Sequence, residues 1–329
     1  MGKKFLSKSN PILTINVYRN DVVESSHSAS AVIIDPSGEI LAEYGDSKMR
    51  TYIRSAAKPF QIMPALELGL QSKFGLSDDE IAVCCSSHSG ETVHIERVQS
   101  VLQKTEIDAS SLRCGIHPPL GVEVRRMLRV SGETPTVLHN NCSGKHSAML
   151  ATAKIKGESL EDYLNPDHPV QQRILKVIEE FSEEESIHVG VDGCSAPVYY
   201  LQIKSIAMMY QKLASDNDNA TVSDVWEKMT SNPLMIAGSG RFDSVLMEDG
   251  KGTLLSKMGA EGVQCMSFKT PAGPVGLAVK VHDGTRRAVL PAVLYLLDKF
   301  GLTPDGDYDR IRKPELKNHM GIVVGRIEV

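Results

Sequence analysis

The sequence predicts a mixed α/β (α+β) fold in which an antiparallel sheet is flanked by helices and accompanied by a helical region. Two observations lead to this prediction. Strand patterns at 29–34 and 39–44 flank an Asp-Pro-Ser-Gly turn, which is typical of a hairpin. Two further strand patterns, at 263–268 and 275–281, flank a Pro-Ala-Gly turn, and helical patterns lie between the two strand-rich regions.

The remaining elements follow in chain order. A strand at 11–18 precedes the first hairpin, and strands at 187–191, from 254 and at 321–324 follow it. Ser77 and Glu80 form a capping-box pattern that marks the start of a helix. Other helices are expected at about 55–69, 92–102, 148–153, 169–181, 201–215, 222–231 and 285–300.

Composition excludes several classes of protein. The 329 residues are 41% hydrophobic and 23% charged, which is ordinary for a globular protein. A net charge of −5 without a basic block argues against nucleic acid as the partner. No apolar run approaches the ~20 residues that a membrane helix needs. The basic start at 1–4 is not followed by an apolar signal segment, and the six cysteines are scattered, so we expect a cytoplasmic protein with reduced thiols.

Ser55 and Lys58 are three residues apart in Arg-Ser-Ala-Ala-Lys-Pro, so they share one face of a helical turn. A lysine that burial or a second cation keeps partly neutral can remove the proton of a serine hydroxyl. At a helix N-terminus, Ser55 would also be placed where developing negative charge is favoured. The alternative is that Ser55 is a helix cap and Lys58 a solvated residue.

Other polar clusters follow apolar segments. Ser-Ser-His-Ser-Gly at 86–90 suggests a turn inside a pocket, although a surface loop is the alternative. The stretch His-Asn-Asn-Cys-Ser-Gly-Lys-His at 139–146 is the densest in chemical groups, and Asp192 and Cys194 follow a strand. Such density beside a buried helix is unfavourable unless the groups pair with one another or with a ligand. We therefore expect a functional site here.

The order of these motifs resembles that of two enzyme families. Ser55-x-x-Lys58, Ser87-x-Ser89 and Lys257-x-Gly259 follow the S-x-x-K, S-x-N and K-T-G order of class A β-lactamases and penicillin-binding proteins, but depart from it in the second and third motifs. Together with the 139–146 and 192–194 stretches, they more closely resemble the asparaginase II family of the Rhizobium etli type, over about 10–325.

This resemblance implies a serine β-lactamase/glutaminase-like fold and hydrolysis of L-asparagine to L-aspartate and ammonia, usually by a homodimer. It implies one catalytic unit over 1–329, with site residues from both an N-terminal part (about 1–150) and a C-terminal part (about 151–329). The implied partners are the small-molecule substrate and a second copy of the chain, with no nucleic acid and no membrane. The implied cofactor is zinc, which affects substrate affinity rather than the chemistry.

Residue by residue, the family's two Ser-Lys tandems correspond to Ser55–Lys58 and Ser87–Lys257. Our hypothesis is that Ser55 attacks the side-chain amide and Lys58 accepts its proton. Ser87 and Lys257 would then relay a proton to the departing ammonia and position water. The roles of the two serines could be reversed.

The resemblance also implies ligands for the metal, and the residues themselves suggest contacts for the substrate. The metal site corresponds to Cys142, Lys145 and Cys194, with Asp192 beside them. Spacing alone does not predict zinc, because Cys-x-x-Lys is an unusual zinc pattern, and buried inert thiols are the alternative. Candidates for substrate binding are Arg54, His88, Asn140, Asn141 and, within the glycine-rich 238–240 loop, Gly240.

Three alternatives remain open at this level. A glutaminase would differ from an asparaginase only in accepting one more methylene. A β-lactam-binding or transpeptidase-like enzyme is disfavoured by the missing signature residues and the missing export signal. A non-catalytic protein that binds zinc or small amides would have no need of two serines and two lysines in these positions.

Overall fold

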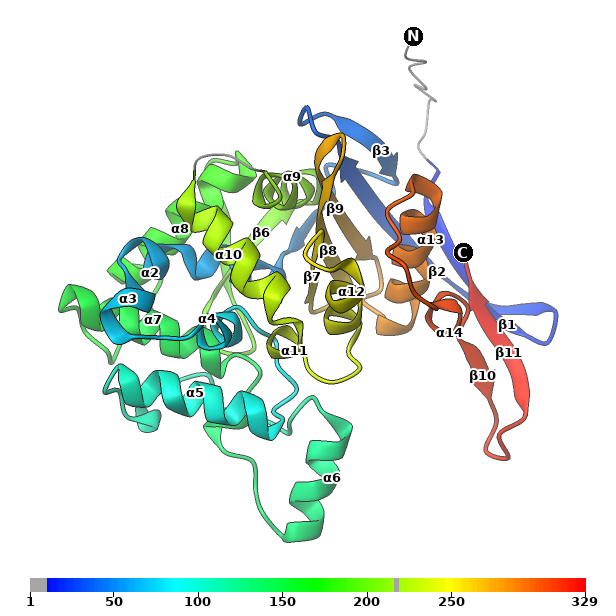
Figure 1. Ribbon diagram of the computed structural model, residues 1–329. Coiled ribbons are helices and arrows are strands. Elements are labelled where there is room, and N and C mark those ends of the chain that lie inside the picture. The colour runs from blue at the N-terminus through cyan, green and yellow to red at the C-terminus, as the bar shows by residue number, and fades with distance from the viewer. Residues whose placement is uncertain (1–10, 216–218) are drawn as a thin grey trace.

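An antiparallel sheet forms one side of the protein (Figure 1), in a computed structural model that describes residues 11–215 and 219–329. Its strands are β1 (Leu13–Arg19), β2 (Val22–Ile34), β3 (Ile40–Tyr44), β7 (Leu254–Gly259), β8 (Val263–Thr270), β9 (Gly273–Val281), β10 (Glu315–Lys317) and β11 (Val323–Glu328). They are ordered β10-β11-β1-β2-β9-β8-β7, with β3 paired to β2. The basic start at 1–4 lies outside the described residues.

Helices form the other side of the protein and also cover the sheet (Figure 1). They are α1 (Lys58–Gln61), α2 (Met63–Glu67), α3 (Leu70–Phe74), α4 (Asp78–Cys84), α5 (Thr92–Lys104), α6 (Val122–Ser131), α7 (Ser143–Lys156), α8 (Pro169–Ser182), α9 (Ile203–Leu213), α10 (Ala220–Ser231), α11 (Pro233–Ile236), α12 (Phe242–Gly250), α13 (Val289–Phe300) and α14 (Asp309–Arg312). Single 3₁₀ turns are η1 (Arg54–Ala57), η2 (Ala109–Ser111), η3 (Val137–His139) and η4 (Arg286–Ala288). The predicted mixed α/β class is confirmed.

The two ends of the chain meet in the sheet. β2 pairs with β9, so that Ala31 lies opposite Val279, and β1 pairs with β11. α9 packs against β2, β8 and β9, whereas α13 packs against β1, β8, β9 and β11. In Figure 1 the strands of the sheet lie between these two helices.

Local sequence signals account for several element boundaries. Asp35 stabilises the predicted hairpin turn, because its Oδ1 accepts hydrogen bonds from the backbone N–H groups of Ser37 and Glu39. Ser77 and Glu80 form the predicted capping box at the start of α4. The helix predicted over 55–69 is divided into η1, α1 and α2, because prolines lie in the first turns of α1 and α2 and cannot donate a backbone hydrogen bond.

Some elements differ from the expectation. The helix expected from residue 201 begins only at Ile203, because Pro197–Gln202 forms a strand, β6, between β4 (Arg50–Tyr52) and β5 (His188–Val191). α6 and α12 were not expected as helices. α6 has no buried residue, and its apolar side chains Val122, Met127 and Val130 are exposed.

Helix α7 is the most buried part of the helical region. Its residues from Ser143 to Ala153 are all buried, including the polar residues of its first turn. Gly144 permits this position: a Cβ there would lie 2.2 Å from the carbonyl oxygen of Val83 in α4. The chain's polar stretch at 139–146 is thus held against α4, next to the loop that carries Ser87.

No described helix combines the length and apolarity that crossing a bilayer requires.

We predict that Gly144→Ala destabilises the protein by about 2 kcal/mol or more, because the added methyl group meets backbone that cannot rotate away. Thermal unfolding followed by circular dichroism would measure the change. Gly193→Ala is the matched control, since a Cβ at Gly193 has no heavy atom within 4 Å. Equal unfolding temperatures for the two variants would contradict this account of α7 packing.

Candidate active site

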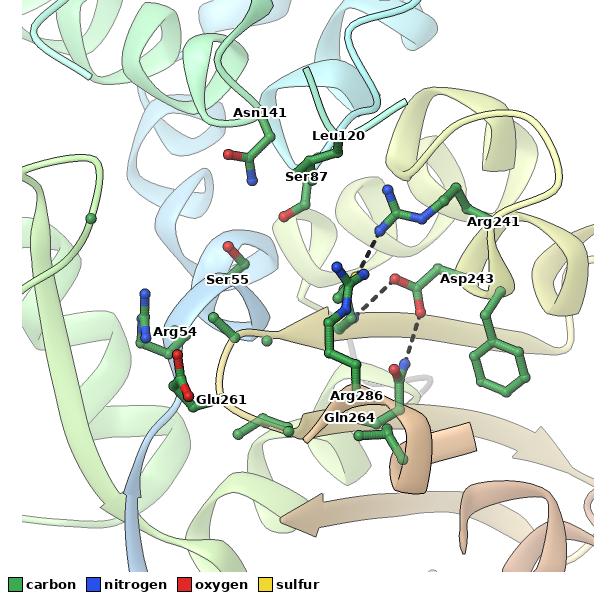
Figure 2. A pocket seen from close by; sticks show the side chains of 18 of the residues that line it. Arg54, Ser55, Ser87, Leu120, Asn141, Arg241, Asp243, Glu261, Gln264 and Arg286 are labelled. Atoms are coloured by element: carbon green, nitrogen blue, oxygen red, sulfur yellow. Dashed lines mark hydrogen bonds between the residues drawn. The ribbon is translucent and has the colours of Figure 1, made fainter. Parts of the chain in front are cut away.

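A pocket of about 660 Å³ brings together distant segments of the chain. Its wall includes residues from η1, the loop after α4, the start of α7, the loop after β5, and β7. In Figure 2 the hydroxyl groups of Ser55 and Ser87 face the same space, with Asn141 above them. The pocket therefore places both predicted serines where one ligand can reach them.

The Ser87 hydroxyl lies between two lysines. Lys58 Nζ donates a hydrogen bond to Ser87 Oγ at 3.0 Å, and Lys257 Nζ donates one to the same oxygen at 2.8 Å. Lys58 also donates to the backbone oxygens of Ser86 and Asn141. Ser87 and both lysines are buried. When Lys257 is neutral, its amine can instead accept a hydrogen bond from the Ser87 hydroxyl.

The two predicted Ser-Lys tandems are not equivalent. Ser87 and Lys257 are in direct hydrogen-bond contact. Ser55 and Lys58 are joined by a backbone hydrogen bond, from the Lys58 N–H to the Ser55 carbonyl, but no hydrogen bond joins their side chains in the described part of the chain, and the Lys58 amino group is turned toward Ser87. Both lysines thus converge on Ser87, while Ser55 forms part of the pocket wall.

Two backbone features place Ser55 in that wall. Arg54 has a φ of 52°, in the left-handed region that residues with side chains rarely adopt. Gly259, at the end of β7, packs against the carbonyl of Ile53, where a Cβ would lie 2.7 Å from the oxygen. This close approach holds β7, and with it Lys257, against the turn that carries Ser55.

Lys257 is suited to accept a proton near neutral pH. Burial lowers its pKa to about 7, and the charge of Lys58 lowers the pKa as well. Asp243 and Cys142 act in the opposite direction, and Arg241 adds to the lowering. A lysine that is partly neutral at pH 7 can act as a general base.

The four residues predicted for the metal site lie together, and three of them, Cys142, Asp192 and Cys194, line the pocket. Lys145 Nζ donates to Cys194 Sγ at 3.1 Å, and Cys194 Sγ lies 3.8 Å from a carboxylate oxygen of Asp192. The Cys142 and Cys194 side chains are hydrogen-bonded to each other. Arg54 Nε donates to the other Asp192 oxygen at 2.6 Å. The cluster is therefore linked to the turn that precedes Ser55.

Charge in this cluster is unevenly distributed. The hydrogen bond with Cys194 lowers the pKa of Cys142 well below its usual value, and the same pairing raises the pKa of Cys194. Burial alone would lower the pKa of Lys145, but the charges of Cys194 and Cys142 raise it instead. The arrangement corresponds to a thiolate at Cys142 beside a protonated Lys145.

The donor set fits zinc only with lysine as a ligand. Over residues 11–215 and 219–329, no three His, Cys, Asp or Glu side chains are placed to hold a metal ion. Cys142 and Cys194 provide the sulfur donors that zinc prefers. Lys145 is the nearest further donor, and it must lose its proton before it can coordinate a metal.

Two of the predicted substrate contacts have structural partners instead. His88 is completely buried and does not belong to the pocket wall. Its Nε2 donates a hydrogen bond to Ser143 Oγ at 2.9 Å, and its Nδ1 accepts a hydrogen bond from the Gly90 N–H. Asn140 reaches the wall, but its amide nitrogen donates to the backbone oxygens of Cys114 and Gly115. Their side chains therefore fix the loops around the pocket.

The other three predicted contacts line the pocket. Gly240, Asn141 and Arg54 are all part of the wall. Asn141 Oδ1 is 3.0 Å from His117 Nε2. The charge of Arg54 is already paired with Asp192. Of these, Asn141 is the side chain that Figure 2 shows directed toward Ser55 and Ser87.

The sequence analysis missed a group of charged and polar residues on the side of the pocket opposite Arg54, namely Arg241, Asp243, Gln264 and Arg286. Asp243 is buried and accepts hydrogen bonds from Ser256 Oγ at 2.7 Å, Gln264 Nε2 at 2.7 Å and the Met258 N–H at 3.0 Å. A signal was present, because Arg241 and Asp243 directly follow the glycine-rich loop at 238–240.

Comparisons with solved structures give only a general likeness. A structure of Mglu in its glutamate form matches with 14% identity and a TM-score of 0.48, over 85% of this chain and 62% of that chain. A β-lactamase from Sphaerobacter thermophilus DSM 20745 matches with 14% identity and a TM-score of 0.43, over 85% and 94% of the two chains. This chain thus spans less than two thirds of the Mglu chain. No curated protein sequence matches it.

The comparison with protein families is decisive. The match begins at residue 15, in β1, and ends at residue 329, so it includes both serines, both lysines and the cysteine cluster. The chain belongs to the L-asparaginase II family.

Proposed function

We propose that this amidohydrolase is an L-asparaginase that works through a serine nucleophile and a Ser-Lys proton relay. The observation that carries the proposal is the contact of two buried lysines with Ser87 Oγ, beside a second serine in the same pocket. Hydrolysis of an amide needs a nucleophile, a base and a proton donor for the leaving amine. The family match supports the reaction class.

In the proposed mechanism, Ser55 Oγ attacks the carbon of the substrate's side-chain amide. Its proton passes through the Ser87 hydroxyl to neutral Lys257, because Lys58 donates three hydrogen bonds and has no free lone pair to accept it. The C–N bond then breaks, the leaving nitrogen takes a proton from Ser87, and ammonia departs. An ester of Ser55 remains in the pocket.

Ser87 regains its proton from Lys257, which is thereby neutral again. A water molecule then attacks the ester carbon and gives its proton to neutral Lys257, through Ser87. Aspartate is released, and the Ser55 oxygen takes its proton back from Lys257 through Ser87. The pKa of about 7 for Lys257 suits a group that must both accept and return a proton.

The hydrogen bonds also support a version in which the serines exchange roles. Ser87 already contacts both possible bases, so it could be the nucleophile, with Ser55 positioning the substrate. Glutamine is the alternative substrate, because it differs from asparagine by one methylene group. The following experiment separates these versions.

We predict that the wild-type protein releases ammonia from L-asparagine faster than from L-glutamine, and that Ser55→Ala lowers kcat by at least about 10³-fold. The reason is that no other group can form the ester in the proposed mechanism. Ammonia release measured with a coupled assay gives the rates. Ser87→Ala should keep a slow burst of product, because only the relay is lost.

Ser110→Ala is the control, because Ser110 is exposed in η2 and does not belong to the pocket wall. A burst that survives in Ser55→Ala but not in Ser87→Ala would assign the nucleophile to Ser87. Faster release from glutamine would change the substrate, and full activity in both variants would exclude the serine mechanism.

We predict that kcat/KM rises as the pH increases through about 7. Below this pH Lys257 is protonated and cannot accept a proton, whereas above it the neutral amine predominates. A pH–rate profile from about pH 5.5 to 8.5 measures the rise, and the residual activity of Lys257→Ala should lack it. The same rise in Lys257→Ala would show that another group is responsible.

We also propose that the cluster beside the pocket binds zinc through Cys142, Cys194 and Lys145, with Asp192 nearby. Support comes from two hydrogen-bonded thiols and an amine 3.1 Å from one of them. When bound, the metal would affect substrate affinity, because Asp192 also holds Arg54 in the pocket wall. No catalytic step passes through it.

We expect about one zinc per chain by atomic emission, and a loss of this zinc in Cys142→Ser and Cys194→Ser. The KM for asparagine should rise more than kcat falls. Cys84→Ser is the control, since Cys84 is buried in α4 and does not belong to the pocket wall. Protein without near-stoichiometric zinc, together with an unchanged KM in Cys142→Ser, would exclude the site.

A further inference from the structure

Two arginines of the pocket wall have no carboxylate partner. Arg241 Nη1 is 3.4 Å from Ser89 Oγ and Nη2 is 2.9 Å from the sulfur of Met258, both weak partners for a guanidinium. Within residues 11–215 and 219–329, no carboxylate oxygen lies within 4.0 Å of Arg241 or Arg286. The third pocket arginine, Arg54, differs because it is paired with Asp192.

The nearest acidic side chain is already engaged. Both oxygens of Asp243 accept hydrogen bonds, Oδ1 from Ser256 and Gln264 and Oδ2 from the Met258 N–H. Its charge is therefore spread over three donors and does not form an ion pair with Arg241. The positive charge of Arg241 is left facing the pocket.

The two guanidinium groups point toward each other in Figure 2, on the side of the pocket opposite Arg54. Burial lowers the pKa of Arg241, Asp243 raises it, and the nearby charge of Arg286 lowers it further. Two like charges facing one space are unfavourable in the empty pocket and favourable around an anion. Arginine is the residue that best matches a carboxylate, because its planar fork can donate two parallel hydrogen bonds.

We infer that Arg241 and Arg286 together bind the α-carboxylate of the amino-acid substrate. This inference rests on the proposed function, because it identifies the part of that same pocket which recognises the end of the substrate remote from the reacting amide. Binding of the carboxylate by these two arginines makes the pocket specific for amides that carry a free carboxylate. Arg54 is then a structural residue that is held by Asp192.

Binding of L-aspartate, which keeps the α-carboxylate, tests the inference without catalysis. By isothermal titration, we expect the Kd of L-aspartate to rise about 10- to 100-fold in Arg286→Gln and in Arg241→Gln, because each removes hydrogen bonds to a charged group. Arg126→Gln, at an exposed position in α6, is the matched control and should bind like the wild type. Unchanged binding in both pocket variants would overturn the inference.

A substrate that lacks the carboxylate separates recognition from folding. For 3-aminopropanamide, which is asparagine with hydrogen in place of the α-carboxylate, kcat/KM should be low in the wild type and no lower in the two variants. An equal loss with both substrates would mean that the arginines only support the fold, and would overturn the inference. Unfolding temperatures of the ligand-free variants should not fall, because one of two like charges has been removed.

The outcomes also distinguish this inference from the proposed function. If the wild type releases ammonia from no amide, the asparaginase proposal fails. The titrations with L-aspartate and L-glutamate still decide whether the two arginines bind a carboxylate. Arg286 is exposed, so its variant is expected to fold even if Arg241→Gln does not.

Discussion

The site depends on holding two buried amino groups against one hydroxyl oxygen. Lys58 and Lys257 would repel each other if both were charged, and burial strengthens that repulsion. The protein offsets it with hydrogen bonds from Lys58 to two backbone carbonyls and from both lysines to Ser87. The remaining repulsion is relieved because the pKa of Lys257 is about 7. Its amine can therefore lose a proton near neutral pH, so the two amino groups need not both be charged.

The fold supplies this contact by joining its two sides. Lys58 and Ser87 come from the helical side, whereas Lys257 comes from β7, an edge strand of the sheet. Two close approaches fix their relative positions. Gly259 lets β7 touch the carbonyl of Ile53, and Gly144 lets α7 press against α4. The reactive groups are thus placed by backbone packing, which is more rigid than contacts between long side chains.

Charge divides the pocket into regions with different tasks. On one side, Arg54 and Asp192 form an ion pair that connects the cysteine cluster to the turn before Ser55. On the other side, Arg241 and Arg286 face the pocket without an acidic partner. The lysines and serines lie between these regions. A small molecule with an anionic end and an amide end matches this distribution, and an amino-acid amide has both.

The sequence by itself determined the local structure and the chemical inventory. Turn residues at 35–38, the capping box of Ser77 and Glu80, and the periodicity of buried strands and helices depend on neighbours in the chain, so they could be predicted. The motifs also identified the family, which the match over 15–329 shows. α6 was not predicted, although its sequence is amphipathic, and its apolar side chains Met127 and Val130 are exposed.

Only the tertiary structure decided which of these residues touch. Spacing placed Lys58 with Ser55, but the packing of α1 against the loop after α4 turned it toward Ser87. His88, predicted as a substrate contact, is instead completely buried and holds Ser143. Arg241 and Arg286 lie 45 positions apart and share no motif, so their common pocket could not be predicted. The sequence determined which groups are present, whereas long-range packing determined their distances, and hydrogen bonding and charge pairing depend on distance.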